Sequence, residues 1–177
     1  MKKALALGVS LPIIAFLLFA CCPPSPSLRS QNGEKKENQV KTVKVNEDIR
    51  IGEVRWKVLE VSKTETIASD YGEPKTANGV YVIVKLEAEL LSKEGGSISN
   101  SQFAVVDSKE RVFTHSTDGE LALPSEKKTF VFKDVNPNVP ITGYAVFETA
   151  KDVTGLKLKI KDLRLFSDEY GLVELGL

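Results

Sequence analysis

The chain has 177 residues, 42% of them hydrophobic, and its 24 basic side chains balance its 24 acidic ones. A domain that binds nucleic acid needs a concentrated basic surface, so this balance argues against a nucleic-acid partner. The two cysteines are adjacent, at positions 21 and 22. The rest of the chain therefore has no disulfide and no cysteine-ligated metal.

The first 20 residues have the pattern of a secretory signal peptide. Lys2 and Lys3 form a positive start, and an apolar run follows from Ala4 to Ala20. A charged start, an apolar run and a small final residue are typical of an export signal that is cleaved off. A membrane-spanning helix needs about 20 apolar residues, and this run is shorter. We therefore predict a signal peptide over residues 1–20.

This signal ends at Leu18-Phe19-Ala20-Cys21, which resembles the lipobox of bacterial lipoproteins. That motif has a leucine-like residue three positions before the cysteine and a small residue directly before it, although Phe19 departs from the usual small or polar residue between them. The resemblance implies cleavage before Cys21 and lipid on its thiol. Several acyl chains give a durable anchor, because each buried methylene group contributes about 0.8 kcal/mol. The expected location is the extracytoplasmic side of the cell membrane or outer membrane.

The alternative is an ordinary secreted protein in which Cys21 and Cys22 are free thiols or form a disulfide. Adjacent cysteines rarely form a disulfide, because its geometry needs Cα atoms about 4.4–6.8 Å apart and converging side chains. This constraint favours lipidation of Cys21. It leaves the role of Cys22 open.

Residues 21–41 are predicted to be a lipidated cysteine followed by a disordered linker. Proline, serine, glutamine and charged residues dominate this segment, and it has almost no apolar side chains to bury. Removing the signal peptide takes away two lysines and no acidic residue, so the mature chain has a net charge of about −2. The remaining residues, 42–177, are enough for one domain with its own hydrophobic core.

The clearest structural pattern in this domain is the segment Val80–Leu91. Every second residue from Val80 to Leu90 is apolar, whereas the other face is mixed at Tyr81 and Ile83 and charged further on. An alternation with period two is typical of a strand that packs one face on a core. We therefore expect one long strand here.

Other segments repeat the alternation at shorter length, and no window of useful length has a helical period. The apolar parity changes between Ile160 and Leu163, which predicts a bulge or bend near Lys161–Asp162. The last strand, Leu172–Leu175, is expected to pair with Leu163–Phe166. About seven to nine strands separated by turns predict an antiparallel β-sandwich. The shorter alternating segments contain Val43, Val45, Ile49, Ile51, Trp56, Val58, Phe103, Val105, Phe130, Phe132, Ala145, Phe147, Leu156 and Leu158.

Three blocks of strand and turn residues carry a family resemblance. They are Asn78–Val82, Ser101–Phe113 with its F-x-V-x-D spacing up to Asp107, and Asn136-Pro137 followed by Ile141–Glu148. Together they resemble a family of exported bacterial domains of unknown function that is related to a mycobacterial immunoprotective extracellular antigen. The resemblance implies an immunoglobulin-like β-sandwich with no known activity and no catalytic residues.

The sequence departs from this family pattern at three positions. Glu110 stands where a turn glycine is usual, and Asn138 stands where glycine normally follows the proline. Phe113 replaces a common tyrosine. The Cys-Trp-Cys core of antibody domains is also missing, so Trp56 does not indicate an antibody-type domain.

His115, the only histidine, is a candidate catalytic base. A base needs a nucleophile and an orienting acid within hydrogen-bond reach, and the sequence proximity of Ser116 and Asp118 does not establish such a triad. We interpret His115 as a surface-loop residue. A single histidine and no domain cysteine also argue against a zinc site. The sequence thus gives no catalytic residue, no metal site and no cofactor.

Acidic residues in the loops are the remaining candidates for a cation site. Asp118-Gly119-Glu120, with Asp107 and Glu110 upstream, offers oxygen ligands for calcium, but the EF-hand spacing is absent. Acidic loops are also common in sandwich domains simply because they are solvated. We therefore expect no metal at these residues.

Lys157, Lys159 and Lys161 form the most concentrated charge feature, since they alternate on one face of a predicted strand. The simplest interpretation is a solvated strand face, or an edge strand that lysine protects from aggregation. The alternative is a surface for an anionic ligand such as a cell-wall polymer or lipid headgroups.

The leading functional hypothesis is a non-enzymatic binding or accessory module of the cell envelope, anchored to the membrane through Cys21, with an envelope protein as a possible partner. Domains of this type present edges and loops to partners. The alternative is an envelope hydrolase or calcium-dependent enzyme that uses Asp107, Asp118 and Glu120. Convergence of these carboxylates in a pocket, with raised pKa values, would favour the enzyme.

Overall fold

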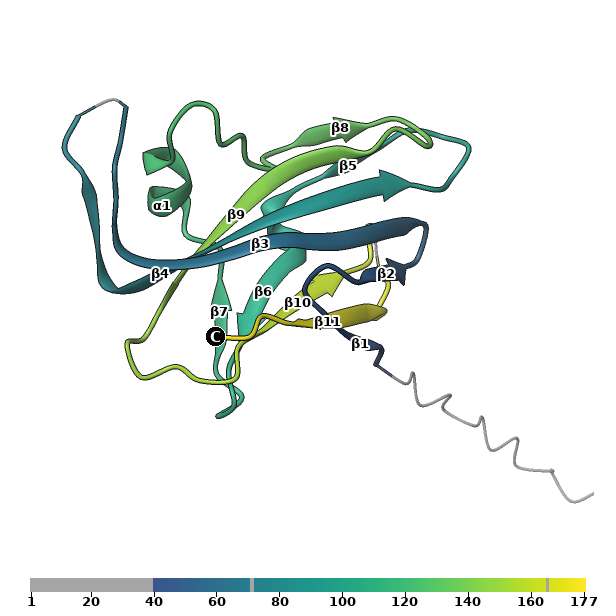
Figure 1. The fold of residues 1–177 in the computed structure, drawn as a ribbon. Coiled ribbons are helices and arrows are strands. Elements are labelled where there is room, and N and C mark those ends of the chain that lie inside the picture. The colour runs from purple at the N-terminus through teal and green to yellow at the C-terminus, as the bar shows by residue number, and fades with distance from the viewer. Residues whose placement is uncertain (1–39, 71, 165) are drawn as a thin grey trace, which may run out of the picture. The chain divides into compact units, whose positions relative to one another are not determined.

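Two β-sheets form the layers of the domain in the computed structural model, which describes residues 40–70, 72–164 and 166–177 (Figure 1). The described residues also include a single turn of 3-10 helix, Asn100–Gln102, and one short helix, α1 (Thr117–Ala122). The strands of the described ranges are β1 (Thr42–Lys44), β2 (Asp48–Ile51), β3 (Val54–Ile67), β4 (Lys75–Leu90), β5 (Gly96–Ile98), β6 (Phe103–Val106), β7 (Val112–Thr114), β8 (Lys133–Val135), β9 (Ile141–Thr149), β10 (Lys157–Lys161) and β11 (Tyr170–Glu174).

The expected all-β sandwich is confirmed. One sheet has the order β1-β11-β10-β6-β7 and the other the order β2-β3-β4-β9, so the nine strands of these two sheets fall within the predicted seven to nine. A separate ribbon pairs β5 with β8. All paired strands are antiparallel except β1 and β11, which run parallel. This parallel pair ties the start of the domain to its last strand.

The core between the sheets is built from the apolar faces of both layers and is centred on three aromatic side chains. Trp56 of β3, Phe103 of β6 and Phe130 of the segment before β8 are all buried. The Trp56 and Phe103 rings meet edge to face at 5.2 Å, and Phe130 lies 5.7 Å from Phe103. Edge-to-face contacts of this kind add to the stabilisation from burial alone. The trio therefore joins the two sheets at the middle of the core.

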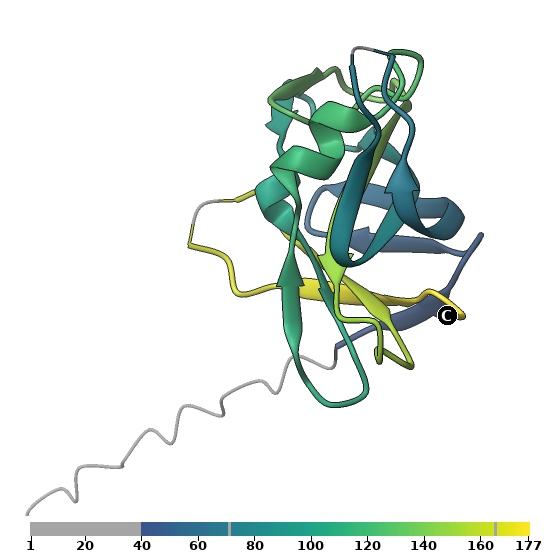
Figure 2. The same cartoon turned by 90° about the vertical axis from the view of Figure 1, so that its left-hand side faces the viewer.

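A second, smaller cluster lies on the outer face of the four-stranded sheet, where α1 covers it (Figures 1 and 2). Tyr81 and Ile83 of β4 pack there with Ala122 and Val146. These are the apolar residues that made one face of the Val80–Leu91 pattern mixed. Within the described ranges, neither helix is long and apolar enough to cross a membrane.

Two local expectations were wrong. The last strand pairs with β10 and β1 and not with Leu163–Phe166, because residues after β10 form the connection to β11. Phe130 and Phe132 do not alternate on a strand: Phe130 is buried, whereas Phe132 adopts a left-handed φ of 45° and is 81% exposed. The strand β10 ends at Lys161, where the bend was expected.

Candidate functional site

The predicted lipid-attachment residue, Cys21, and its neighbour Cys22 lie outside the described residues, as do the signal peptide at 1–20 and residues 21–39 of the linker. The remaining candidates all lie in the described domain. They fall into separate places.

Asp107 directly follows β6, and its carboxylate holds the turn between β6 and β7. Its Oδ1 accepts the backbone N–H groups of Lys109 and Arg111 at 2.9 Å each, and its Oδ2 accepts Nε of Arg111 at 2.7 Å. Burial acts to raise the pKa of Asp107, but these hydrogen bonds outweigh it and hold the pKa below its usual value. Arg111 also reaches Asp152, whose pKa is lowered to about 2 by hydrogen bonds from Lys109 and Arg111. We call residues 107–111 with Asp152 the Asp107 turn.

Asp118 and Glu120 lie on α1, at the end of the domain opposite the β6–β7 turn in both views (Figures 1 and 2). Asp118 is exposed and pairs with Nζ of Lys75 at 2.7 Å, whereas Glu120 is buried. Among the described residues, no group of three or more His, Cys, Asp or Glu side chains is arranged to hold a metal ion. The three carboxylates of the enzyme hypothesis therefore do not converge.

The lysine row lies on the interior strand β10, which is hydrogen-bonded to β11 on one side and β6 on the other. The edge-strand interpretation is therefore wrong, while the three side chains do share one face of the sheet. Lys159 stacks its ammonium 4.0 Å from the centroid of the Tyr170 ring, and Lys157 lies 3.9 Å from Glu174. Binding of an anionic ligand on this face stays an untested alternative to a solvated strand face.

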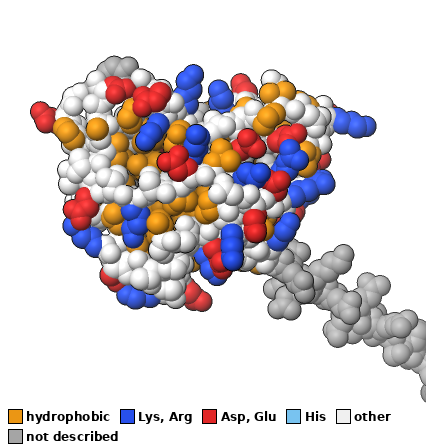
Figure 3. All heavy atoms as spheres, in the orientation of Figure 1, with side chains coloured by type: hydrophobic (Ala, Val, Ile, Leu, Met, Phe, Trp, Pro, Cys, Tyr) orange, Lys and Arg blue, Asp and Glu red, His pale blue; other side chains and the backbone are white. Residues whose placement is uncertain are grey.

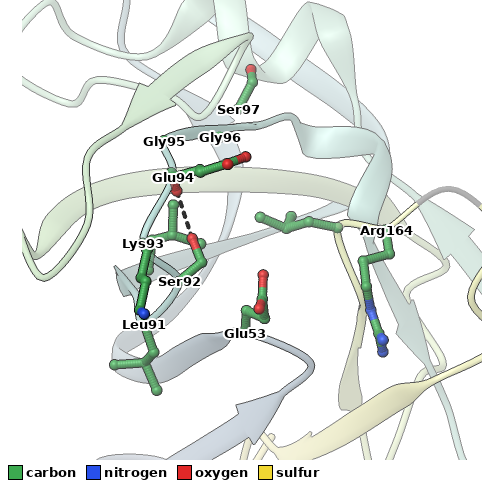
Figure 4. Close-up of a pocket in the computed structure, with 11 residues that line it drawn as sticks. Glu53, Leu91, Ser92, Lys93, Glu94, Gly95, Gly96, Ser97 and Arg164 are labelled. Atoms are coloured by element: carbon green, nitrogen blue, oxygen red, sulfur yellow. Dashed lines mark hydrogen bonds between the residues drawn. The ribbon is translucent and has the colours of Figure 1, made fainter.

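A groove of about 640 Å³ lies beside the β4–β5 connection. Figure 4 shows Glu53, from the turn between β2 and β3, pointing into the space between Ser92–Glu94 and Arg164. Arg164 already hydrogen-bonds Asp162 and Glu169. None of the buried, unpartnered polar atoms of the described residues belongs to this lining. The groove is thus a surface hollow with exposed charges of both signs.

A second pocket, of about 390 Å³, lies between the 3-10 turn and α1, and we call it the Asn100–Glu120 pocket. Ser99 caps the 3-10 turn in a reciprocal capping box with Gln102, which fixes Asn100 in its first position. His115, expected to be a surface-loop residue, is only half-buried, makes an isolated bridge to Phe147 of β9, and lines this pocket. The complete lining is Ser99, Asn100, Ser101, His115, Thr117, Glu120, Val131 and Phe132.

The Glu120 carboxylate helps to hold the backbone of β9, but one of its oxygens forms no hydrogen bond of normal geometry. The backbone of Val146 on the edge strand β9 receives the N–H of Ser116 at 2.7 Å, and its own N–H is directed at the Glu120 carboxylate. Burial raises the pKa of Glu120, and Asn100, His115 and the Val146 N–H lower it only in part. Both amide atoms of Asn100 and Oε1 of Glu120 are nevertheless buried without a hydrogen bond of normal geometry.

These features define a β-sandwich domain whose described acidic residues form no catalytic cluster. The chain belongs to the family described as Domain of unknown function (DUF4352), whose model matches residues 43–170. A curated relative, the uncharacterized protein YxkC of Bacillus subtilis (strain 168), is 25% identical over 122 residues, which cover 66% of this chain and 68% of that protein. Nothing in the family description points to catalysis.

Solved structures of low sequence identity share the fold. The yjhA protein of Bacillus subtilis has a TM-score of 0.59 at 14% identity over 75% of this chain and 99% of that one. The secreted protein MPT63 of Mycobacterium tuberculosis has a TM-score of 0.57 at 12% identity, covering 77% and 98%. The ycdA protein of Bacillus subtilis, named as a candidate lipoprotein, has a TM-score of 0.52 at 12% identity, covering 73% of this chain and 38% of its own. The expected likeness to the mycobacterial antigen family is thus confirmed at the level of fold.

Sequence reasoning singled out Glu120 and His115 but did not find the pocket that they share. Asn100 and Phe132 were not candidates at all. The sequence Ser99-Asn100-Ser101-Gln102 has a detectable signal, since serine followed three residues later by glutamine is a helix-start motif. That motif predicts a helical turn, but it does not show that the turn and α1 line one pocket.

Proposed function

We propose that the mature protein is a cell-envelope lipoprotein whose β-sandwich is a non-catalytic binding or accessory domain. Lipid on Cys21 would hold it to the membrane, and residues 22–41 would separate the domain from the surface. The support for the anchor is the lipobox-like sequence after a short apolar run. The names of two proteins of similar fold, one secreted and one a candidate lipoprotein, agree with export.

The observation that carries a binding role is the separation of the acidic side chains. Asp107 is engaged by Arg111 in its own turn, Asp118 pairs with Lys75 at the surface, and Glu120 contacts the edge of β9. A hydrolase or calcium-dependent enzyme needs such groups around one reacting centre. The described domain instead has apolar side chains that gather between charged ones on the face shown in Figure 3, and an apolar surface of this kind suits contacts with another molecule. The exposed apolar side chains of the whole described domain include Val112, Leu121, Val131 and Phe132.

The anchor is tested by replacing Cys21. We expect wild-type protein in cells to incorporate a fatty-acid probe and to fractionate with membranes, and Cys21→Ala to lose both. The fold should be unchanged, because the first strand of the domain begins 21 residues later, at Thr42. Without acyl chains, little else attracts a near-neutral domain to a bilayer. Absence of label in wild-type protein would show that the lipoprotein interpretation is wrong.

The binding role is tested by photo-crosslinking in intact cells from Val112 and Leu121, which are 62% and 77% exposed at opposite ends of the domain. One of these positions should recover the same envelope protein repeatedly, and the recovery should fall when Cys21→Ala releases the chain from the membrane. The exposed polar residue Lys63 of β3 provides the matched control, since a crosslinker there is also open to solvent but does not replace an apolar side chain. Recovery of only abundant bystanders from both exposed positions would contradict the role.

A further inference from the structure

The Asn100–Glu120 pocket is walled by buried polar atoms that form no hydrogen bond of normal geometry, although the Asn100 amide lies beside the Glu120 carboxylate. Asn100 is 3% exposed and Glu120 is 7% exposed. Leaving a buried donor or acceptor unpaired is costly, and most such groups in folded proteins have a partner. Here three atoms of two adjacent side chains share the same condition in the wall of one pocket: Nδ2 and Oδ1 of Asn100 and Oε1 of Glu120. The pocket is therefore built to receive a polar group.

The charges around the pocket select the sign of that group. Its only titratable lining residues are Glu120 and His115, and no lysine or arginine lines it. Within the described residues Glu120 forms no salt bridge, and the His115 ring beside it is the one group of the lining that competes as a cation when it is protonated. A positively charged group would gain an ionic partner there, whereas an anion would be repelled by Glu120.

The acceptors match the donors of an ammonium group in number. A protonated amine has three N–H donors and no acceptor. Glu120 Oε1 and Asn100 Oδ1 provide two acceptors, and the hydroxyl groups of Ser99, Ser101 and Thr117 line the same pocket. Both oxygens are covered in the empty protein, so one ammonium group can bind them and one hydroxyl only after the Asn100 side chain rotates away from Glu120.

The open side of the pocket is apolar. Val131 and Phe132 line it and are 55% and 81% exposed. The left-handed φ of 45° at Phe132 is uncommon for a bulky residue and holds the side chain outside the core that Phe130 enters. An aromatic ring at this position offers an apolar surface to an aliphatic stem and a favourable face to a cation.

We propose that this pocket binds a protonated primary amine on an aliphatic stem, as in a lysine side chain, either as a free small amine or within a peptide. The ammonium group occupies the closed end beside Asn100 and Glu120, and the stem lies against Val131 and Phe132. This site goes beyond the proposed envelope role and does not depend on it. Amine binding is measured with purified protein, so the result does not depend on whether crosslinking in cells finds an envelope protein.

The test is isothermal titration calorimetry of the full chain in neutral detergent. The probe is Nα-acetyl-lysine amide, with Nα-acetyl-norleucine amide as the matched compound that keeps the stem and lacks the amine. A ligand of this size binds weakly, and we expect saturation with a Kd of about 1 mM for the lysine compound. Butylamine and a Gly-Gly-Lys-Gly-Gly peptide distinguish the two sources of the amine: tighter binding of the peptide assigns the site to peptides, and equal binding assigns it to small amines.

Variants assign the binding to the pocket. Glu120→Gln keeps the shape and removes the charge, and should weaken binding by about tenfold or more. Phe132→Ala should weaken it by roughly threefold. Val112→Ala, at an exposed apolar residue on the other end of the domain, should change nothing. Unfolding curves of each variant confirm that it is folded.

Three outcomes would overturn the proposal. Equal binding of the norleucine compound would show an apolar pocket only. Unchanged binding by folded Glu120→Gln would remove the carboxylate from the site. No saturable binding at about ten times the expected Kd would indicate that ordered water alone meets Asn100 and Glu120.

Discussion

Asp107 and Glu120 are both buried carboxylates, one at each end of the domain, but their surroundings differ in kind. Asp107 receives hydrogen bonds from Lys109 and Arg111, and its pKa is lowered. Glu120 keeps one oxygen without a partner, and its pKa is raised. Both side chains meet backbone N–H groups, so both help to hold the main chain. Of these two carboxylates, only Glu120 has a buried oxygen without a hydrogen bond of normal geometry.

This difference separates a structural carboxylate from a candidate binding residue. A buried charge with all its hydrogen bonds made stabilises the loop around it, and any ligand would have to displace those bonds. A buried charge with an unfilled acceptor instead lowers stability in the empty protein. Local departures from the most stable arrangement are expected at functional sites. The Asp107 turn is accordingly a poor place to look for function, and the Asn100–Glu120 pocket is a good one.

The largest expected effect is from Asp107→Ala. This change removes the acceptor of three N–H donors in the Asp107 turn and leaves Arg111 without its buried partner. We expect Tm to fall by roughly 5 °C or more, measured by thermal unfolding of the full chain. Asp118→Ala is the matched control, because it removes one exposed ion pair with Lys75. Its Tm should change by about 1 °C at most.

Acid should weaken the same turn. Because the pKa of Asp107 is lowered in the fold, its contribution is fully present above the unfolded value of 3.8 and is lost as pH falls through the folded pKa. The pKa of Asp162 is lowered too: burial acts against this, but hydrogen bonds from Ser167 and Arg164 prevail. Unfolding measured between pH 5 and pH 2 should therefore show a loss of stability below pH 3.8, and a smaller loss for Asp107→Asn. An equal loss in the variant would contradict the comparison.

Glu120→Gln should raise the stability of the protein, whereas Asp107→Ala should lower it. Replacing the buried charge by an amide of the same shape removes its desolvation cost, and we expect a gain of about 1 kcal/mol in the free energy of unfolding at pH 7. The variant retains an oxygen for the Val146 N–H. Urea unfolding at equal protein concentration measures the difference. A loss of stability at pH 7 would mean that the charge is structural, as at Asp107.

The pH dependence of that gain follows from the raised pKa of Glu120. Ionisation is disfavoured in the folded state, so the penalty is absent below the unfolded value of 4.5 and grows as pH rises from there through the folded pKa. The advantage of Glu120→Gln over wild type should therefore disappear near pH 4. A gain that is independent of pH would assign the effect to packing and not to charge.

Strand periodicity was sufficient to predict the layers of this domain but not their connections. Val43, Val45, Ile49 and Ile51 share one parity, yet β1 and β2 belong to different sheets, because a turn with Asn46 at φ 70° separates them. Alternation reports which side of a strand is buried, and both sheets bury a side on the same core. It therefore carries no information about which sheet a short strand joins.

The site was less predictable, because it depends on contacts between segments far apart in the sequence. Asn100 and Glu120 come together because α1 packs over β4 and β9 at Gly119, where an added Cβ would lie 2.7 Å from Cγ1 of Val146. Tyr81 and Ile83 on the nominally outward face of β4 were the available sign that something covers that face. What covers it is a helix of six residues, too short to produce a helical period.

The smallest expected effect tests the two departures from the family pattern. Glu110 and Asn138 stand where the family usually has glycine, and both adopt left-handed φ angles, of 61° and 57°. A left-handed conformation costs a residue with a side chain about 1–2 kcal/mol, and glycine avoids this cost while losing about 0.5–1 kcal/mol through its freedom when unfolded. Glu110→Gly should therefore stabilise the protein by about 0.5 kcal/mol.

Asn138→Gly is the matched control for this change, and it should have a smaller effect, because asparagine tolerates the left-handed region better than glutamate. Urea unfolding of both variants beside wild type measures the two differences. Glu110 lies inside the Asp107 turn, where its N–H bonds the carbonyl of Asp107 at 3.0 Å. The double variant Glu110→Gly with Asp107→Ala tests whether the Asp107 carboxylate stabilises the turn conformation. If the carboxylate holds Glu110 in its strained conformation, the benefit of glycine should shrink once the carboxylate is gone. Simple addition of the two effects would show that the turn forms without it.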